Sequence, residues 1–446
     1  MPMTEPVLTK RIPTYPYGDP KDRHAVWYDE YVKTGGYEAL AAALEKEPAA
    51  IVDTVKDSNL RGRGGAGFPC GLKWTFLPKD YEGQRYLAVN SDESEPCTFK
   101  DRMLLDFDPH QLLEGIAITC WACGLQTAYI YIRGEYHEQA VTVQKAIDEA
   151  YKNGVFGKQG LMKGKVDFAV DCYLHRGAGA YVCGEETGLL ESLEGKRGWP
   201  RIKPPFPAVA GLFGKPTIIN NVETLACVPH IVQHGSEWFK SLGCESTIGG
   251  PPSYGTKLMG VSGHVNRPGV YECDLGFSLR TLIDEYCQGM KGGKKLKAII
   301  PGGISMGVLT ADQVDAELDF DIGRKNDLLG LGTACPTVLD EDTDMIMVAR
   351  NITRFFKNES CGQCTPCREG SGWIYKILCR IEEGEGTTRD LDLLLEIAGS
   401  MGAMPGTTIC GLADGNNWAV RTIINKFRDE FEARVKPSLV PVTMSV

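Results

Sequence analysis

The sequence predicts an α/β protein built from three regions, and three observations support this prediction. In residues 1–250, helical patterns alternate with β-rich runs, which is typical of a layered α/β domain. The composition changes at IGGPPSYGTK, and residues 251–342 then show short strand patterns around one helical pattern. From residue 343 to 446 every pattern is helical. A chain of 446 residues with 43% hydrophobic content can bury the core that such a division needs.

In the first region, the spacing of apolar residues separates helices from strands. Helices are expected at YEALAAALEK (37–46) and AVTVQKAIDEAY (140–151), and strands at YLAVN (86–90), TAYIYIRG (127–134) and DFAVDCYL (167–174). Alternation of this kind indicates a sheet covered by helices.

An uncharged run of eighteen residues, GIAITCWACGLQTAYIYI (115–132), approaches the length of a membrane-spanning helix. Thr119, Gln126 and Thr127 are polar, however, and Gly124 separates a helical pattern from a β-rich one. We therefore expect a buried helix followed by a core strand.

In the second region, two strand patterns, KLMGVSG (257–263) and GVYECDL (269–275), meet at a Pro-Gly turn and lead into one expected helix, LRTLIDEYCQG (279–289). Further strand-like runs follow at LKAIIPGG (296–303) and PTVLDED (336–342). This order predicts a small β-grasp-like module.

In the third region, four amphipathic patterns separated by glycine-bearing loops predict a four-helix bundle. The expected helices cover 344–360, 371–384, 388–401 and 416–435.

Composition excludes several functional classes. A net charge of −10 and a pI near 5.4 argue against nucleic acid or an anionic membrane surface as the main partner, because both require clustered Lys and Arg. The first twenty residues lack the apolar segment of a secretory signal. The sixteen cysteines are therefore expected in a reducing compartment, as metal ligands or small buried hydrophobes.

The strongest glycine motif is RGRGGAGFPCGLKW (61–74), with five glycines and Lys73. Such a loop can expose backbone N–H groups to phosphate oxygens and approach a ligand closely. The preceding AIVDTVKDSNL has helical rather than strand periodicity, so the Rossmann context is missing, and Lys73 does not stand in a Walker arrangement. An ordinary glycine turn is the alternative.

Two acidic loops accompany this motif. NSDESEPCTFKDR (90–102) follows an expected strand and carries four acidic side chains. These could accept hydrogen bonds from the hydroxyl groups of a ribose or ribityl chain and from the edge of a flavin or nicotinamide. A solvated acidic loop is the alternative. HRGAGAYVCGEETGLLESLEG (175–195) places two glutamates at the start of a helix, where simple capping is the alternative. KPPFPA and TIINNVETL add an aromatic ring and amide donors. Together these segments suit a site for a flavin and a nucleotide.

The spacing C-x2-C-x2-C at Cys361, Cys364 and Cys367 indicates an iron-sulfur cluster, and a structural zinc site is the alternative. Downstream, only Cys379 and Cys410 could supply a fourth ligand. Cys379 lies within an expected helix, whereas Cys410 lies in a loop between two expected helices. The pattern therefore predicts one [4Fe-4S] cluster on Cys361, Cys364, Cys367 and Cys410.

Taken in order, GRGGAGFP, SDESEP, GAGAYVCGEE, KPPFPA, NNVET and ESCGQCTPCREG resemble the family of NADH-binding flavoprotein subunits of respiratory complex I over nearly the whole chain. The resemblance implies an FMN- and NADH-binding α/β domain, an SLBB ubiquitin-like module and a cluster-bearing helical bundle. It implies FMN binding by Gly62, Gly64, Lys73, Asn90, Asp92, Glu93, Tyr181, Gly184, Glu185, Glu186, Asn220, Asn221 and Thr224, and extends cofactor binding to Arg63, Gly65, Ala66 and Gly67.

For the second ligand, the resemblance implies that Phe68, Phe76 and Phe206 enclose the adenine of NADH and that Glu95 approaches the nicotinamide end. It places the flavin's phosphate near the asparagines and Thr224, and implies that Glu185 disfavours NADPH. Two positions depart from the family pattern: Cys70 replaces an expected threonine and Cys97 an expected glycine, so a positive φ at Cys97 is not assured and either thiol could be sensitive to oxidation.

The expected activity is NADH dehydrogenation, with hydride transfer to FMN followed by single-electron transfer to the cluster and, in the complex, to quinone. The expected partners are a thioredoxin-like [2Fe-2S] subunit (E type) and a large iron-sulfur subunit (G type), with a cytoplasmic location peripheral to the inner membrane through the complex. One alternative is a diaphorase subunit of a soluble NAD-linked hydrogenase or formate dehydrogenase, which often carries additional ferredoxin-like segments not present here. Another is a zinc-stapled scaffold without enzymatic activity.

Overall fold

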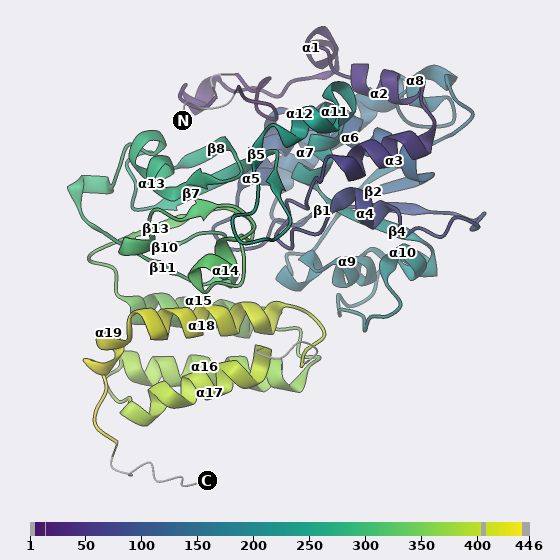
Figure 1. Ribbon diagram of the computed structural model, residues 1–446. Helices are drawn as coiled ribbons and strands as arrows, with labels where there is room; N and C mark the ends of the chain where they lie inside the picture. The colour runs from purple at the N-terminus through teal and green to yellow at the C-terminus, as the bar shows by residue number, and fades with distance from the viewer. Residues whose placement is uncertain (1–4, 14, 403–406, 439–446) are drawn as a thin grey trace.

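The computed structural model describes residues 5–13, 15–402 and 407–438, and it divides into the three regions expected from the sequence (Figure 1). The N-terminal α/β region lies beside the other two, which stack on each other: the middle module lies above the C-terminal bundle (Figure 1). The proposed boundary at residue 250 falls between β5 (Gly243–Cys244) and β6 (Ser253–Tyr254), and that at 342 falls between β13 (Thr337–Asp340) and α15 (Met345–Glu359). Both boundaries remain predictions.

The N-terminal region is built on a parallel four-stranded sheet in the order β3-β2-β1-β4. Its strands are β1 (Tyr86–Ser91), β2 (Thr127–Ile132), β3 (Asp171–Arg176) and β4 (Thr217–Asn221). Because β1 pairs with β2 on one side and β4 on the other, the strand order reverses between β1 and β4. Ligands of open α/β sheets bind outside the carboxyl ends of strands at such a point.

Helices cover both faces of this sheet (Figure 1). The predictions of strands near 86–90, 127–134 and 167–174 and of helices near 37–46 and 140–151 are confirmed. The helices of the region are α1 (Tyr28–Lys33), α2 (Glu38–Ala43), α3 (Pro48–Asp57), α4 (Cys70–Trp74), α5 (Lys100–Phe107), α6 (Pro109–Cys123), α7 (His137–Lys152), α8 (Gly160–Gly164), α9 (Glu186–Leu193), α10 (Pro207–Ala210), α11 (Val222–His234) and α12 (Ser236–Lys240).

The uncharged run 115–132 forms the buried helix α6 followed by strand β2, as predicted. Gly124 ends the helix with a positive φ of 63°, a conformation that glycine adopts at little cost. The one acidic residue of α6, Glu114, is buried and accepts hydrogen bonds from Tyr31 Oη and from the backbone N–H groups of Tyr37 and Leu40. In the described part of the chain, no helix has the length and apolar character needed to cross a bilayer.

The middle module is a mixed five-stranded sheet in the order β11-β10-β13-β7-β8. A hairpin of β7 (Thr256–Gly263) and β8 (Gly269–Asp274) begins it, and β13 returns parallel to β7, as a β-grasp requires. The module also contains β9 (Phe277–Ser278), β10 (Leu296–Ile300), β11 (Leu309–Thr310), β12 (Glu317–Leu318) and α14 (Ile322–Asn326).

The helix predicted for this module is less regular in the structure than the sequence pattern indicates. The predicted helix at 279–289 is a short helix α13 (Leu279–Thr281) that widens into a π-helical turn, η4 (Leu282–Tyr286). The N–H of Cys287 bonds to the carbonyl of Leu282, five residues back. Widening the turn keeps Leu282, Ile283 and Tyr286 buried together, so packing overrides the regular 3.6-residue pattern.

The bundle contains α15, α16 (Thr365–Glu382), α17 (Thr388–Gly402) and α18 (Leu412–Lys426), as predicted. Their apolar faces enclose a core that includes Phe356, Ile374, Leu394 and Ile423. The predicted helix at 416–435 is divided at Phe427, whose φ of −124° ends α18 before the short α19 (Arg428–Glu432). The break lets Phe431 turn into the bundle core.

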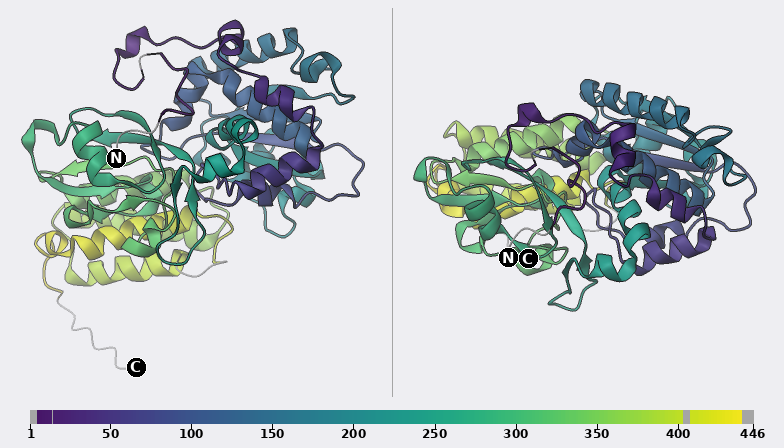
Figure 2. Two further views of the ribbon diagram at one scale, coloured as in Figure 1. Left: turned by 45° about the horizontal axis from the view of Figure 1, so that its top comes forward. Right: turned by 90° about the horizontal axis from the view of Figure 1, so that it is seen from above.

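The N-terminal segment crosses from the first region to the middle module (Figure 2). Its contact point is Glu272 on β8, whose buried carboxylate accepts hydrogen bonds from the backbone N–H groups of Val7, Leu8 and Thr9 at 3.1, 2.9 and 2.9 Å. The Thr9 hydroxyl donates a fourth at 2.7 Å. A single side chain therefore ties residues more than 260 positions apart in the sequence.

Candidate functional site

A cavity of about 640 Å³ lies at the carboxyl ends of β1 and β4, where the strand order reverses. Its volume is in the range of cofactor sites in proteins. Loops of all three regions form its wall. The following predicted site residues line it: Gly64, Gly65, Ala66, Asn90, Asp92, Glu93, Glu95, Tyr181, Gly184, Glu185 and Asn221.

The glycine loop is closed on itself at its base, because the Gly62 N–H donates to the Phe68 carbonyl at 2.9 Å. Gly65 and Gly67 have φ values of 134° and 65°, which favour glycine. At Gly64, an added Cβ would come within 3.0 Å of the Asn221 Cβ. A side chain at this position would require Asn221 to shift, so the glycine lets the loop approach the end of β4 closely.

Several predicted binding residues lie behind the wall and do not line the cavity. Thr224 accepts a hydrogen bond from the Arg63 N–H at 2.8 Å, and Asn220 accepts one from Trp74 Nε1 at 3.0 Å. Lys73 donates to the Ile219 carbonyl at 3.1 Å and lies 3.7 Å from Glu186. These contacts fix the glycine loop and α4 against β4 and α11. Gly62 and Gly67 likewise lie outside the cavity lining.

The acidic loop after β1 contributes three predicted carboxylates that the protein holds in different ways. Burial raises the pKa of Asp92 to about 7, although the Ser94 hydroxyl and Arg133 favour its charged form. Burial, followed by the charge of Asp101, raises the pKa of Glu93 to about 7. The Glu93 carboxylate accepts hydrogen bonds from two backbone N–H groups at the start of α5.

Glu95, the third carboxylate, connects all three regions at the cavity. It accepts hydrogen bonds from Tyr181 Oη at 2.6 Å and from the N–H and hydroxyl of Ser305 at 2.8 and 2.9 Å. Tyr181 in turn packs edge-on against Phe355 of the bundle, with ring centroids 5.0 Å apart. Burial raises the pKa of Glu95, while these hydrogen bonds oppose the shift.

We predict that Asp92→Asn stabilises the flavin-free protein at pH 8 but much less at pH 5. The folded-state pKa of Asp92 lies above its unfolded value of 3.8, so the wild-type protein loses stability from this group as pH rises from 3.8 to about 7. Asparagine removes that loss, which is of the order of 2 kcal/mol between pH 5 and pH 8. Urea unfolding at both pH values measures the difference. An equal effect at the two pH values would contradict the prediction.

Glu185 caps α9, since its carboxylate accepts hydrogen bonds from the N–H groups of Thr187 and Gly188 at 2.8 and 2.9 Å. The capping alternative is thus correct for Glu185, which nevertheless also lines the cavity. Lys203 lies 2.9 Å from Glu185 and 2.7 Å from Glu186 and reduces their repulsion.

The three aromatic residues predicted to enclose adenine are all exposed. Phe68 and Phe76 have ring centroids 6.0 Å apart, and the side chains of Phe68, Phe76 and Phe206 are 43%, 50% and 58% exposed. Exposed aromatic faces of this kind suit stacking with a planar base.

Sequence reasoning missed the part of the wall that comes from the middle module and the bundle. Lys100, which opens α5, was not assigned a role, and neither was Ser305. Asp101 was counted among the four acidic side chains of its loop, and it does line the cavity. The signal that could have indicated the middle module's contribution is the glycine spacing in PGG (301–303) and GLGT (330–333). At Gly303 an added Cβ would lie 2.5 Å from Glu95.

The cysteines of the predicted cluster lie next to this cavity, and Cys410 lines it. The Ile409 N–H donates to Cys364 Sγ at 3.3 Å, and the Ser360 hydroxyl lies 3.3 Å from Cys367 Sγ. Burial raises the pKa of Cys410 to about 12, and nearby charges at Glu185, Cys367 and Cys361 add to the shift. Cys379 lies within α16, as expected.

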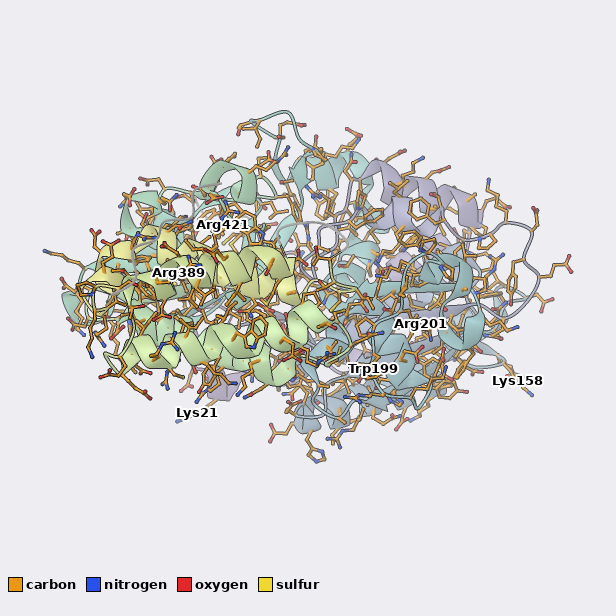
Figure 3. The ribbon with its side chains drawn as sticks, turned by 90° about the horizontal axis from the view of Figure 1, so that it is seen from below. Lys21, Lys158, Trp199, Arg201, Arg389 and Arg421 are labelled. Atoms are coloured by element: carbon orange, nitrogen blue, oxygen red, sulfur yellow. The ribbon has the colours of Figure 1, made fainter. Side chains whose placement is uncertain are left out.

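Trp199 Nε1 donates to the Cys361 carbonyl at 3.1 Å and connects the N-terminal region to the bundle at this point. Figure 3 shows Trp199 at the junction of these two parts. Over the described ranges, no three His, Cys, Asp or Glu side chains converge as a ready metal site. The four-cysteine ligand set therefore stays a prediction.

The residues present fit both implied cofactors. For a flavin, the cavity offers glycines that leave room for a ligand and carboxylate acceptors for hydroxyl groups. Behind its wall, the Nε and Nη1 atoms of the buried Arg63 have no hydrogen-bond partner among the described residues. For a cluster, four thiols lie in one neighbourhood, and an N–H group donates to one sulfur, as is common around iron-sulfur centres.

The two departures from the family pattern have different structural settings. Cys97 adopts a φ of 73°, so the backbone keeps the conformation that glycine favours, at a cost of about 1–2 kcal/mol for a residue with a side chain. Cys70 is buried at the start of α4, and burial raises the pKa of its thiol to about 12. A thiol of that kind is largely protected from oxidation.

Models of three known domains match the chain in order. The Nuo51 FMN-binding domain matches residues 55–230, the SLBB domain matches 257–348, and the NADH-ubiquinone oxidoreductase-F iron-sulfur binding region matches 347–434.

Relatives match over most of the chain as well. One F-type subunit of NADH-quinone oxidoreductase, from Rhizobium meliloti, is 48% identical over 98% of this chain and 100% of its own length. The F-type subunit of the same enzyme in Rickettsia rickettsii is 49% identical over 91% of this chain and 93% of its own length. A chain of the NAD+-reducing [NiFe]-hydrogenase, solved in the H2-reduced state, superposes with a TM-score of 0.80 and 36% identity over 92% of this chain and 67% of that one.

Proposed function

The chain belongs to the family of F-type subunits of NADH-quinone oxidoreductase, and from this premise we propose which of its residues perform the family's reaction. The protein is an NADH dehydrogenase flavoprotein subunit with FMN and a [4Fe-4S] cluster. FMN accepts a hydride from NADH and releases electrons singly, and the cluster takes them up one at a time. The chain's own part in this reaction is to hold the two groups next to each other.

FMN is held in the cavity by the glycine loop, the acidic loop and the end of β4. The phosphate end lies next to Gly64, Gly65, Ala66 and Asn221, which line the cavity at the glycine loop and at the start of α11, because glycine loops and helix N-termini favour anions. Asn90, Asp92 and Glu93 provide acceptors for the ribityl hydroxyls. Arg63, Lys73, Asn220 and Thr224 support this wall from behind, and Glu186 supports it through Lys73.

NADH lies at the open side of the cavity. Phe68, Phe76 and Phe206 stack against its adenine. Glu95, which accepts a hydrogen bond from Tyr181 Oη, approaches the nicotinamide end. Glu185, which lines the cavity, disfavours the 2′-phosphate of NADPH through charge repulsion. No side chain has to supply a proton for hydride transfer.

One observation carries the proposal that electrons leave through the bundle: Cys410, the predicted fourth cluster ligand, lines the same cavity as the flavin-binding residues. Cys361, Cys364, Cys367 and Cys410 hold the cluster. We further assign the chain to a respiratory complex at the inner membrane, with a thioredoxin-like [2Fe-2S] subunit and a large iron-sulfur subunit as partners, because a single cluster must pass its electrons on. The 48% identity to the Rhizobium relative, compared with 36% to the hydrogenase chain, favours this over a hydrogenase diaphorase.

An anaerobic NADH titration of the full chain, reconstituted with FMN, iron and sulfide, tests this assignment. NADH should bleach the visible flavin absorption, and an electron paramagnetic resonance (EPR) signal of a reduced four-iron cluster should then develop. NADPH at the same concentration should do so far less effectively. A flavin that stays oxidised in the presence of NADH would overturn the proposed function.

A further inference from the structure

A buried cluster of charged side chains lies directly behind the cavity wall, where the N-terminal region meets the middle module. Lys100 opens α5, Glu223 lies in the first turn of α11, and Lys257 comes from β7 of the middle module. All three side chains are at most 1% exposed. Charges buried to this extent destabilise a protein unless each is paired with an opposite charge. The partner of each charged group therefore indicates its role.

Glu223 is the centre of the cluster. One of its carboxylate oxygens accepts a hydrogen bond from Lys257 Nζ at 2.6 Å and lies 2.8 Å from Lys100 Nζ. The other oxygen accepts a hydrogen bond from the Leu258 N–H at 2.8 Å. The glutamate of the N-terminal region is therefore held mainly by residues of β7 in the middle module.

The cluster reaches the cavity through Lys100 and Asp101, both of which line it. Lys100 Nζ lies 2.6 Å from Asp101 Oδ1, and Asn221 Nδ2 donates to Asp101 Oδ2 at 2.6 Å. Asn221 also caps α11 and contacts Gly64 of the glycine loop. A continuous chain of contacts thus leads from Lys257 to the part of the wall where the proposed function places the flavin's phosphate.

The charges of this group balance only while Lys257 is protonated. The cations are Arg63, Lys100 and Lys257, and the carboxylates are Glu223, Asp101 and, above its pKa of about 7, Glu93. Loss of the Lys257 charge would leave an excess of negative charge beside a site for a phosphate dianion. In a region of low dielectric constant, an excess charge of this kind acts on a phosphate group several ångströms away.

We propose that Lys257, supplied by the middle module, is a positioning residue of the FMN site that acts through Glu223 to keep the cavity receptive to the phosphate group of the flavin. This inference rests on the proposed function, because it assumes that FMN occupies the cavity. It gives the middle module a part in cofactor binding, although Lys257 itself does not line the cavity.

The titration behaviour of the cluster agrees with this role. Burial lowers the pKa of Lys257 to about 8, although the charge of Glu223 favours its protonated form. Glu223, Lys100, Cys335 and Cys227 are the titratable groups that act on it. Burial lowers the pKa of Lys100, but Asp101 and Glu223 more than compensate, and its pKa is raised. Burial raises the pKa of both thiols and Glu93 ionises near pH 7, so the charge that this group loses as pH rises through about 8 is that of Lys257.

The test compares FMN with riboflavin, which lacks the phosphate. Flavin fluorescence titrations of the full chain after FMN removal give both dissociation constants for the wild type, for Lys257→Met and for a control, Lys291→Met, which removes an exposed lysine from the same module. Lys257→Met should weaken FMN binding about tenfold or more while changing riboflavin binding less than about twofold. Lys291→Met should leave both constants unchanged.

A pH series on the wild type decides the matter even if Lys257→Met does not fold. Above the pH at which Asp92 and Glu93 ionise, near 7, the preference of the wild type for FMN over riboflavin should decrease further as pH rises through about 8, and that of Lys257→Met should not. Equal losses for the two flavins in the variant, or a wild-type preference that does not decrease as pH rises through about 8, would overturn the inference and leave the proposed function intact. A wild-type chain that binds neither flavin would overturn both.

Discussion

Replacing Cys410 by alanine should abolish the [4Fe-4S] cluster. With three thiolates left, the cluster lacks one of its four protein ligands, and the fourth position would open towards the cavity that Cys410 lines. Iron and acid-labile sulfide per chain should fall from about four of each to near zero after reconstitution. The EPR signal of the NADH-reduced protein should disappear with them.

The matched control is Cys379→Ala, because Cys379 is the other cysteine downstream of Cys367 and lies within α16. It should keep full iron content and an unchanged EPR signal. If instead Cys410→Ala retains a normal four-iron signal and Cys379→Ala loses it, the ligand assignment made from the sequence is wrong.

Gly64→Val should weaken FMN binding strongly without unfolding the protein. A Cβ at Gly64 would lie 3.0 Å from the Asn221 Cβ, and the valine methyl groups would extend either into Asn221 or into the cavity. Overpacking of this kind costs about 1–3 kcal/mol, which corresponds to a loss of affinity of about 5- to 150-fold. Flavin fluorescence titration measures the affinity, and thermal unfolding monitored by circular dichroism measures the stability.

The control for Gly64→Val is Gly399→Val on α17, since a Cβ there meets no atom within 4 Å. This variant should bind FMN with wild-type affinity. If Gly64→Val also binds FMN like the wild type, the glycine loop does not form the wall next to the flavin.

Most of the architecture could be predicted from the sequence because it follows from local patterns. The carboxyl end of β1 is marked by polar residues directly after an apolar run, and this placed the acidic loop where open α/β sheets bind ligands. The amphipathic spacing of α15 to α18 likewise predicted the bundle. Strand β4, which ends at Asn221, was not predicted as a strand. Where the pattern failed, at η4 and at Phe427, burial of particular side chains determined the backbone.

The candidate site was less predictable where its residues depend on long-range contacts. From the sequence alone, Lys100 would be taken for a surface lysine at the start of a helix. Only the structure shows that it is buried between Asp101 and Glu223. Similarly, Thr224 and Asn220 have residue types suited to ligand binding, but each is already engaged by Arg63 or Trp74. Pairings between residues more than 100 positions apart leave no local signal in one sequence.

The contact between the first residues and Glu272 has a consequence for biosynthesis. The backbone N–H groups of Val7, Leu8 and Thr9 can donate to the Glu272 carboxylate only after β8 has been synthesised, more than 260 residues later. At roughly 5–20 residues per second, the ribosome needs about 13–50 s to reach that point. When the N-terminal region leaves the ribosome, its first residues therefore still lack their contact with Glu272. This contact forms only after the middle module has begun to fold.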